Sequence, residues 1–350
     1  MATSPQLTTG VRESSEFVYK NADDVSICVS ACRDAAQSIF QAMQNQAYST
    51  ETWSNHLLNP KTKDESTLHW IFIVDTLNFS FWSDVDQNDT GKADTQRYTV
   101  RWLNQDWTGY WSLCAAIDRA LAEGFAVTTP SFWKSCSEDK IRHIFRSETR
   151  ESIPMFTERV DCLKQVSSVL LDSYSGSFAN CILQADGSAV KLVQLIVSAF
   201  PCFRDQSIYK TRDIKIYKRA QILVSDIWAC FNGSSFGTFY DIDEITMFAD
   251  YRVPQILHSL GCLVYSPELQ QLLKNLQPLQ HGDNREVELR ACSIWAVELI
   301  RQQIQSQHPD SKINSILIDF YLWDTAKQIQ ASMGDNQESI PCHRTRSIFY

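Results

Sequence analysis

The segment TGYWSLCAAIDRALAEG, residues 108–124, has the periodicity of an amphipathic helix. Apolar side chains recur there at every third or fourth position, which places them on one helical stripe. The stripe consists of Leu113, Ala116, Ile117, Ala120 and Leu121. Gly124 follows, and glycine at this position commonly ends a helix in the left-handed conformation. The segment therefore predicts a helix that buries one face.

The same helical pattern continues on both sides of this segment. Glycine and proline are scarce, at 11 and 10 in 350 residues, which favours long helices over many short strands. Two short aromatic and β-branched runs, residues 68–82 and 97–103, could instead form a small sheet. We expect a mainly α, single-domain protein with a small β element in its N-terminal half. Further helices are expected over residues 29–43, 137–145, 153–174, 188–200, 214–231, 241–252, 266–276, 285–304 and 313–330.

The charge balance favours a small ligand over a long nucleic acid. The formal net charge is −9, and no block of five or more basic residues occurs. A protein that binds a long nucleic acid through its phosphates usually has a basic face. We therefore expect a small-molecule substrate and no direct contact with nucleic acid.

Cysteine spacing and the N-terminal sequence indicate an intracellular protein. The eleven cysteines form no recurring CxxC pairs, and the N-terminus lacks the basic and apolar segments of a secretory signal. No apolar run reaches the roughly 20 residues of a membrane span. The histidines show no metal-ligand spacing. We expect a cytoplasmic protein (a nuclear location stays open) without membrane segment, metal or cofactor. Its first 20 residues are expected to be flexible, and a monomer is favoured although the sequence leaves the oligomeric state open.

A first candidate site lies in MFADYRVPQILHSLG, residues 247–261. Three polar residues, Asp250, Tyr251 and Arg252, interrupt an apolar run just before Pro254. Proline disfavours helical geometry in the residue before it, so a helix break is expected near Arg252. Asp250 then either forms a surface pair with Arg252 or points into a cleft and is used there.

A second candidate is ILIDFYLWDTA, residues 316–326. Asp319 and Trp323 are four residues apart and share a helix face, while Asp324 lies elsewhere on the same helix. Apolar residues surround almost the whole helix, which is typical of a buried one. Buried carboxylates need partners, protons or a ligand. A structural salt bridge and a binding site both remain open.

Basic and aromatic residues supply further candidates. Lys218 and Arg219 lie together on an otherwise apolar helix and could hold a phosphate or form a solvated face. The tryptophan-rich segment RWLNQDWTGYW, residues 101–111, could supply an aromatic wall, although core packing explains it equally well. His56 follows an expected helix and could equally be a core histidine with satisfied hydrogen bonds.

Several of these segments together resemble the queuosine salvage proteins. The resemblance covers about residues 20 to 350 and depends on an ordered set of motifs. It implies an all-helical fold similar to DNA glycosylases with a helix-hairpin-helix core, so that residues 21–350 form one hydrolase domain. The motifs are SFW (80–82), YTVRWL (98–103), DWTGYWSLCAAIDRALAEG (106–124), FRSETRESIPMFTERV (145–160), YKRAQILVSDIW (217–228), FADYRVPQILHSLG (248–261), IDFYLWD (318–324) and HRTRSIFY (343–350).

The resemblance also implies an activity, the hydrolysis of queuosine 5′-phosphate to queuine and ribose 5-phosphate, which salvages queuine for tRNA modification. It places the catalytic carboxylate on Asp250. It assigns substrate binding to Phe248, His56, Asp319, Trp323 and Asp324. The 5′-phosphate requires a cation, for which Lys218 is the first candidate and Arg252 another. Two alternatives remain, a glycosylase acting on a nucleic acid and a non-enzymatic helical interaction protein.

Overall fold

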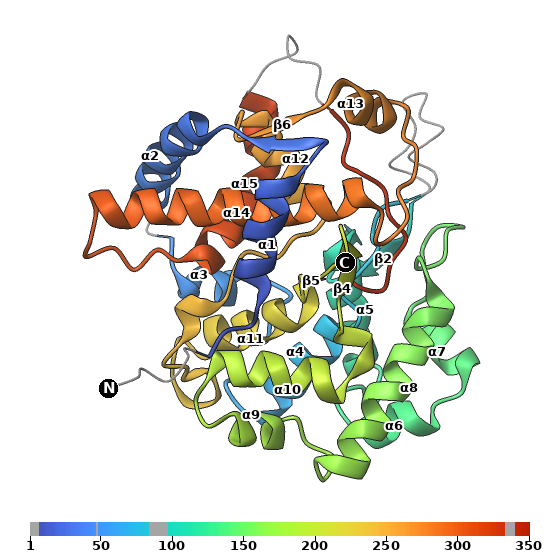
Figure 1. Ribbon diagram of the computed structural model, residues 1–350. Coiled ribbons are helices and arrows are strands. Elements are labelled where there is room, and N and C mark those ends of the chain that lie inside the picture. The colour runs from blue at the N-terminus through green and yellow to red at the C-terminus, as the bar shows by residue number, and fades with distance from the viewer. Residues whose placement is uncertain (1–6, 47, 84–96, 333–339) are drawn as a thin grey trace.

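The computed structural model describes residues 7–46, 48–83, 97–332 and 340–350. Over these residues the protein is mainly helical and forms a single domain with one contiguous hydrophobic core, as the sequence predicts (Figure 1). The first half contains α1 (Val11–Asn21), β1 (Val25–Ile27), α2 (Val29–Asn45), α3 (Thr50–Asn55), α4 (Glu65–Thr76), β2 (Thr99–Trp102), β3 (Gln105–Thr108), α5 (Tyr110–Ala122), α6 (Pro130–Ser135), α7 (Glu138–Ile144) and α8 (Phe156–Ser173). The second half contains α9 (Ala179–Ala185), α10 (Ala189–Ala199), η3 (Pro201–Phe203), β4 (Gln206–Tyr209), β5 (Arg212–Lys215), α11 (Lys218–Cys230), η4 (Ser235–Gly237), η5 (Ile242–Glu244), α12 (Arg252–Ser259), β6 (Leu263–Tyr265), α13 (Pro267–Lys274), α14 (Asn284–Gln307) and α15 (Ser315–Ser332).

Helix α14 supports the upper part of the molecule as drawn in Figure 1, where it packs against α1, α2, α12 and α15. Its charged residues are buried because each finds partners. The Glu288 carboxylate accepts the backbone N–H groups of Asp24 at 2.7 Å and Val25 at 3.0 Å, and the Tyr209 hydroxyl at 2.7 Å. A buried carboxylate with this many donors is tolerated. Glu288 thereby fixes the connection between α1 and β1.

Helices α4 and α11 are the inner helices of the lower part. They pack against each other, and α11 also contacts α3 and α10. Aromatic side chains fill the space behind them, with the ring of Phe72 stacked on that of Phe178 at a centroid distance of 4.4 Å and Phe200 at its edge. Such rings bury a large apolar area each. The packing leaves Lys218, at the start of α11, at the cavity described below.

The expected small sheet is only partly correct. Residues 68–76 belong to α4 and are not a strand, so this part of the prediction is wrong. Apart from His69, Asp75 and Thr76 the segment is apolar, and a buried helix has the same apolar content as a buried strand. The Asp64 side chain accepts the backbone N–H of Thr67 at 3.0 Å and starts the helix. Residues 99–102 do form strand β2, which pairs with β3 in one of three antiparallel pairs, the others being β1–β6 and β4–β5.

Three other expectations need correction. The helix expected over residues 214–231 begins only at Lys218, because residues 212–215 form β5. The helix expected over 241–252 is replaced by the short η5 and by residues 245–250, which lie outside any helix or strand. The first 20 residues are not all flexible. Residues 11–20 belong to α1, where Val11 and Val18 are fully buried against the core.

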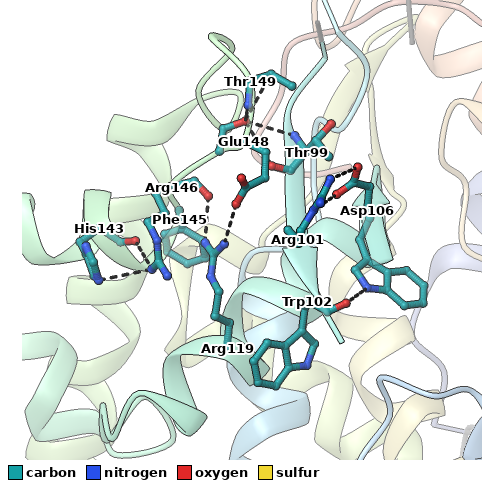
Figure 2. Close-up of polar contacts among 12 residues, drawn as sticks. Thr99, Arg101, Trp102, Asp106, Arg119, His143, Phe145, Arg146, Glu148 and Thr149 are labelled. Carbon is teal, nitrogen blue, oxygen red and sulfur yellow. Dashed lines mark hydrogen bonds and ion pairs between the residues drawn. The ribbon is translucent and has the colours of Figure 1, made fainter. Parts of the chain in front are cut away.

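The β2–β3 hairpin fixes the start of α5, which follows it directly. Figure 2 shows the Arg101 guanidinium binding both carboxylate oxygens of Asp106 across the hairpin, each at 2.7 Å. It also shows Arg119 on α5 donating to the backbone carbonyl of Arg146 at 2.9 Å. The Arg119 side chain is buried, so this contact anchors α5 to the end of α7. Tyr110 and Trp111 at the start of α5 are held in place as a result.

None of the helices in the described ranges is long and apolar enough to cross a bilayer. The likeness to helix-hairpin-helix DNA glycosylases stays a prediction.

Candidate functional site

A cavity of about 530 Å³ lies between α3, α5, α11, the start of α12 and α15. This volume is typical of a site for a small molecule. Every substrate-binding and catalytic candidate from the sequence except Arg219 lines it. These residues are His56, Lys218, Phe248, Asp250, Arg252, Asp319, Trp323 and Asp324.

Asp250 lies at the N-terminus of α12, with only 9% of its surface exposed. One carboxylate oxygen, Oδ1, accepts the backbone N–H groups of Arg252 at 2.7 Å and Val253 at 2.9 Å. A helix N-terminus stabilises negative charge. The surface-pair interpretation is wrong, because Asp250 is buried at the cavity and no ion pair joins it to Arg252 in the described residues. The second oxygen is left for the cavity.

Asp319 on α15 holds the segment that precedes Asp250. Its Oδ1 accepts the backbone N–H of Phe248 at 3.0 Å. Burial raises the pKa of the Asp319 carboxyl group well above its usual range, and the charge of Asp250 raises it further. The hydrogen bond from Phe248 and the charge of Lys218 act in the opposite direction. Asp319 therefore tends to keep its proton when the cavity is empty.

Lys218 is buried in the cavity wall and is not part of a solvated face. Its Nζ donates to the backbone carbonyl of Asn78 at 3.3 Å. Burial lowers the pKa of the ammonium group, while the carboxylates of Asp250 and Asp75 raise it. Lys218 is thus placed to balance the negative charge of neighbouring carboxylates.

Arg219 points away from the cavity and cannot hold a ligand there. Its guanidinium donates to the backbone carbonyls of Thr76 and Cys202 and lies over the rings of Phe79 and Phe203. The side chain is buried in these contacts. Arg219 fastens α11 to the ends of α4 and η3, which is a structural role.

Arg252 is the half-buried cation of the cavity wall. Within the described ranges no carboxylate lies in ion-pair distance of its guanidinium. Lys218 likewise has no carboxylate within ion-pair distance among the described residues, but the charges of Asp250, Asp75 and Asp319 act on it. Arg252 therefore has the donors that a negatively charged ligand group needs.

His56 forms part of an aromatic wall. Its ring stacks on Trp111 with a centroid distance of 3.3 Å and an angle of 12°. Burial lowers the pKa of His56 to about 4, and the positive charge of Lys61 contributes. The ring is thus neutral at physiological pH. Its Nδ1 accepts the backbone N–H of Leu58 at 3.3 Å, so the ring proton belongs on Nε2, where it can be donated.

Trp323 and Asp324 complete the side of the cavity formed by α15. The indole of Trp323 meets the rings of Tyr110 and Trp111 edge to face, both at 6.0 Å. Asp324 accepts the hydroxyl of Tyr48 and is exposed. It therefore lies where solvent enters.

Sequence reasoning missed several residues of the cavity wall. Asp226 is the most notable, because it is a carboxyl group with 5% exposure. It lies eight residues after Lys218, a spacing that returns to the same helix face and could have been noticed. Tyr110 and Trp111 belonged to the tryptophan-rich segment, whose aromatic-wall interpretation is the correct one for these two residues. Other residues of the wall that were missed include Tyr48, Trp53, Asn78, Phe320 and Tyr350.

Tyr350 reaches the cavity from the last residues of the chain. Its ring lies over the buried guanidinium of Arg290 at 3.9 Å, and its backbone oxygen accepts the N–H of Ser80 at 2.9 Å. Arg290 in turn binds both carboxylate oxygens of Asp205, at 3.0 and 2.6 Å. The tail is therefore anchored from two sides.

No group of three or more histidine, cysteine or acidic side chains suited to hold a metal ion occurs in the described part of the chain.

Comparison with known proteins agrees with the resemblance seen in the sequence. Residues 58–350 match the family model of the queuosine salvage protein. Three relatives carry the name queuosine 5′-phosphate N-glycosylase/hydrolase. The one from Schizosaccharomyces pombe is 45% identical over 97% of this chain and 99% of its own length. The one from Mus musculus is 43% identical over 97% and 98%. The one from Sphaerobacter thermophilus is 36% identical over 91% of each chain. The chain belongs to the queuosine salvage protein family.

Proposed function

We propose that this protein hydrolyses the N-glycosidic bond of queuosine 5′-phosphate, releasing queuine and ribose 5-phosphate, and so returns queuine to tRNA modification. The observation that carries the proposal is the arrangement of Asp250. Its carboxylate is fixed by two backbone N–H groups at the edge of a nucleotide-sized cavity, with one oxygen free. The activity for which the relatives are named supports the same reaction.

The chemistry explains why a fixed carboxylate is needed. The N-glycosidic bond breaks through a transition state with positive charge at the anomeric carbon. The anion of Asp250 stabilises that charge and can accept a proton from the attacking water. Because its position is set by backbone hydrogen bonds, no reorganisation is required when the charge develops.

The base is held by the aromatic and acidic parts of the cavity. Phe248 and Trp323 offer flat apolar surfaces, and stacking is worth about 1–3 kcal/mol per base. Asp319 and Asp324 can accept hydrogen bonds from the guanine-like edge or from the cationic amine of queuine. The Nε2–H of His56 is a further donor to the substrate. Together these side chains give both shape and polarity to the base site.

The 5′-phosphate is best assigned to Arg252. Its guanidinium is not neutralised by a neighbouring carboxylate in the described residues, and arginine binds phosphate through two parallel hydrogen bonds. Lys218, the first candidate from the sequence, is surrounded by carboxyl groups and is the weaker choice. We assign Lys218 to charge balance beside Asp250.

The two alternative functions receive less support. A glycosylase of long nucleic acids would need a basic footprint, whereas the net charge is −9. A non-enzymatic interaction protein gives no reason for three buried carboxyl groups, Asp226, Asp250 and Asp319, to line one cavity. Nor would the relatives of such a protein carry the names of enzymes.

The same proposal includes the location and the oligomeric state of the protein. We expect a cytoplasmic monomer that meets tRNA-derived nucleotides only after degradation has released them. The eleven free cysteines suit a reducing compartment. Light scattering after size-exclusion chromatography would give the mass in solution. Binding of intact tRNA with a steep salt dependence would contradict the absence of nucleic acid contacts.

The decisive experiment is direct. The purified protein is incubated with queuosine 5′-monophosphate, and free queuine is measured by mass spectrometry. We expect Asp250→Asn to keep the fold and substrate binding but to lose about 10²–10⁴-fold in rate. Asp310→Asn, which changes an exposed carboxylate, serves as the control. The absence of queuine with the wild type, or a normal rate with Asp250→Asn, would contradict the proposal or the assignment respectively.

A further inference from the structure

Three buried carboxyl groups face the cavity, and they differ in the donors that hold them. Asp250 accepts two backbone N–H groups at a helix N-terminus. Asp319 accepts one backbone N–H. Asp226 accepts none from the backbone among the described residues, and its side-chain partner is the indole of Trp53. Hydrogen bonds from backbone N–H groups to a carboxylate favour its charged form, and Asp226 has none of them in the described part of the chain. Asp226 is therefore the group best suited to stay neutral.

The surroundings of Asp226 reinforce this difference. Asp75 on α4 and Asp319 on α15 place further acidic groups near it, and Tyr110 on α5 lies on the same side. The cation that acts on it is Lys218, on its own helix. Lys218 also serves Asp250, Asp75 and Asp319. Arg219 also acts on Asp75, but two cations cannot neutralise four carboxylates, so part of the cluster must carry protons.

The titration behaviour agrees with the geometry. Burial raises the pKa of the Asp226 carboxyl group well above its usual range, and the neighbouring Asp75 raises it further. The Trp53 hydrogen bond and Lys218 oppose this effect.

The proposed reaction needs a proton at this place. Queuine is a 7-deazaguanine and lacks the N7 at which an ordinary purine is protonated before it leaves. The departing base must nevertheless gain a proton as the glycosidic electron pair moves onto it. Two carboxyl groups with separated protonation states are the usual solution to such a task.

We propose that Asp226 is the proton donor to the departing base, which rests on the hydrolase function proposed above. The glycosidic bond breaks and its electron pair moves to the base, which takes the proton of the Asp226 carboxyl group. Water forms the new bond to the anomeric carbon and passes its proton to Asp250. Transfer of that proton to Asp226 through solvent restores both groups, so that no other reactant is consumed.

The test compares two leaving groups. Queuosine 5′-phosphate requires a protonated leaving base, whereas 4-nitrophenyl β-D-ribofuranoside 5-phosphate releases a stable anion. We expect Asp226→Asn to lower kcat on queuosine 5′-phosphate by about 10²–10⁴-fold and to leave turnover of the nitrophenyl substrate nearly unchanged. Asp250→Asn should lose both activities. Retained nitrophenyl turnover also shows that Asp226→Asn is folded.

A matched control is available in Asp118→Asn. The Asp118 carboxyl group also accepts an indole N–H, from Trp70 at 2.8 Å, and burial raises its pKa to about 7. It does not line the cavity. We expect this variant to retain wild-type kcat on both substrates.

Other outcomes would overturn the proposal. An equal loss on both substrates would give Asp226 a positioning role only, and no loss would remove it from the reaction. A leaving-group-selective loss in Asp319→Asn alone would transfer the role to Asp319. If the protein does not turn over the nitrophenyl compound, the pH dependence of kcat on queuosine 5′-phosphate tests the proposal instead. The alkaline decline of kcat on queuosine 5′-phosphate should disappear in Asp226→Asn, and its persistence would contradict us. Failure of the wild type on queuosine 5′-phosphate would instead refute the proposed function itself.

Discussion

The Asp319 carboxylate accepts the backbone N–H of Phe248 at 3.0 Å, and this bond joins α15 to the segment that ends in Asp250. Phe248 is the proposed stacking surface for the base, and Asp250 is the proposed catalytic anion. Asp319 lies 71 residues after Phe248 in the chain. Its bond holds the segment that carries both residues, while the Asp250 carboxylate itself is fixed by the backbone N–H groups of Arg252 and Val253.

Removal of this acceptor should destabilise the segment. Asp319→Ala leaves the buried N–H of Phe248 without a partner, which costs about 1–3 kcal/mol in the free energy of unfolding. Asp319→Asn retains an acceptor oxygen and should lose much less. Urea denaturation of the two variants measures the difference. Equal stabilities would show that the hydrogen bond does not hold the segment.

Loss of the buried lysine should affect stability more than phosphate binding. Lys218→Met leaves the carboxylates around it without their cation, for which we expect a loss of about 3–5 kcal/mol at neutral pH. The loss should shrink on acidification because the carboxyl groups then become neutral. Denaturation curves at several pH values test this. A stable variant with a raised KM would restore Lys218 as the phosphate ligand.

The mainly helical fold was predictable because helical periodicity extends over most of the chain. The wrong assignments of secondary structure lie in segments where the apolar periodicity does not identify a helix. Residues 68–76 are mostly apolar, so length and composition could not separate a buried helix from a strand. A helix is expected over the segment 245–250 because acidic residues precede it, as is favourable at a helix N-terminus. It is held out of the helix by Asp319, a contact between residues distant in sequence.

Arg252 should determine the preference for phosphorylated substrate. Arg252→Gln removes a charged donor, and a hydrogen bond to a charged group is worth about 1.5–3 kcal/mol. We expect KM for queuosine 5′-phosphate to rise about ten- to hundredfold, with little change for the unphosphorylated nucleoside. Steady-state kinetics on both substrates provide the measurement. An equal effect on both would place the guanidinium away from the phosphate.

Acidification should lower the stability of the folded protein through the buried His56. Its pKa is lowered to about 4 by burial and by Lys61, below the value of about 6.5 in an unfolded chain. Below pH 6.5 the unfolded state thus binds more protons than the folded state. The contribution of the neutral, buried His56 to the stability of the folded state is therefore lost as pH falls toward 4. His56→Gln lacks it, so the stability of the wild type should fall relative to the variant over this range. The exposed His308, changed to Gln, is the control.

A constant difference between the wild type and His56→Gln from pH 7 to pH 4 would contradict a neutral His56. The comparison is needed because His343 is also buried and its pKa is also lowered to about 4. Both proteins contain His343, so its contribution cancels in the difference.

The site was predictable from the sequence only as far as motifs reached. The motif residues, from His56 to Asp324, do meet at one cavity. The individual roles required the structure. Lys218 and Arg219 are adjacent in sequence, yet one faces the cavity and the other fastens two helices. Asp226 lies within the motif YKRAQILVSDIW, but the motif assigned it no role. Its burial at the cavity wall and its lack of backbone donors among the described residues come from the packed structure.

The anchored tail has a consequence for biosynthesis. Tyr350 forms part of the cavity wall and is fixed by Arg290 and Ser80, which are made much earlier. Domains begin to fold while the chain is still being synthesised. This cavity nevertheless cannot close until residue 350 has left the exit tunnel of the ribosome. A nascent chain from which Tyr350 has not yet emerged therefore carries a folded scaffold without a finished cavity wall.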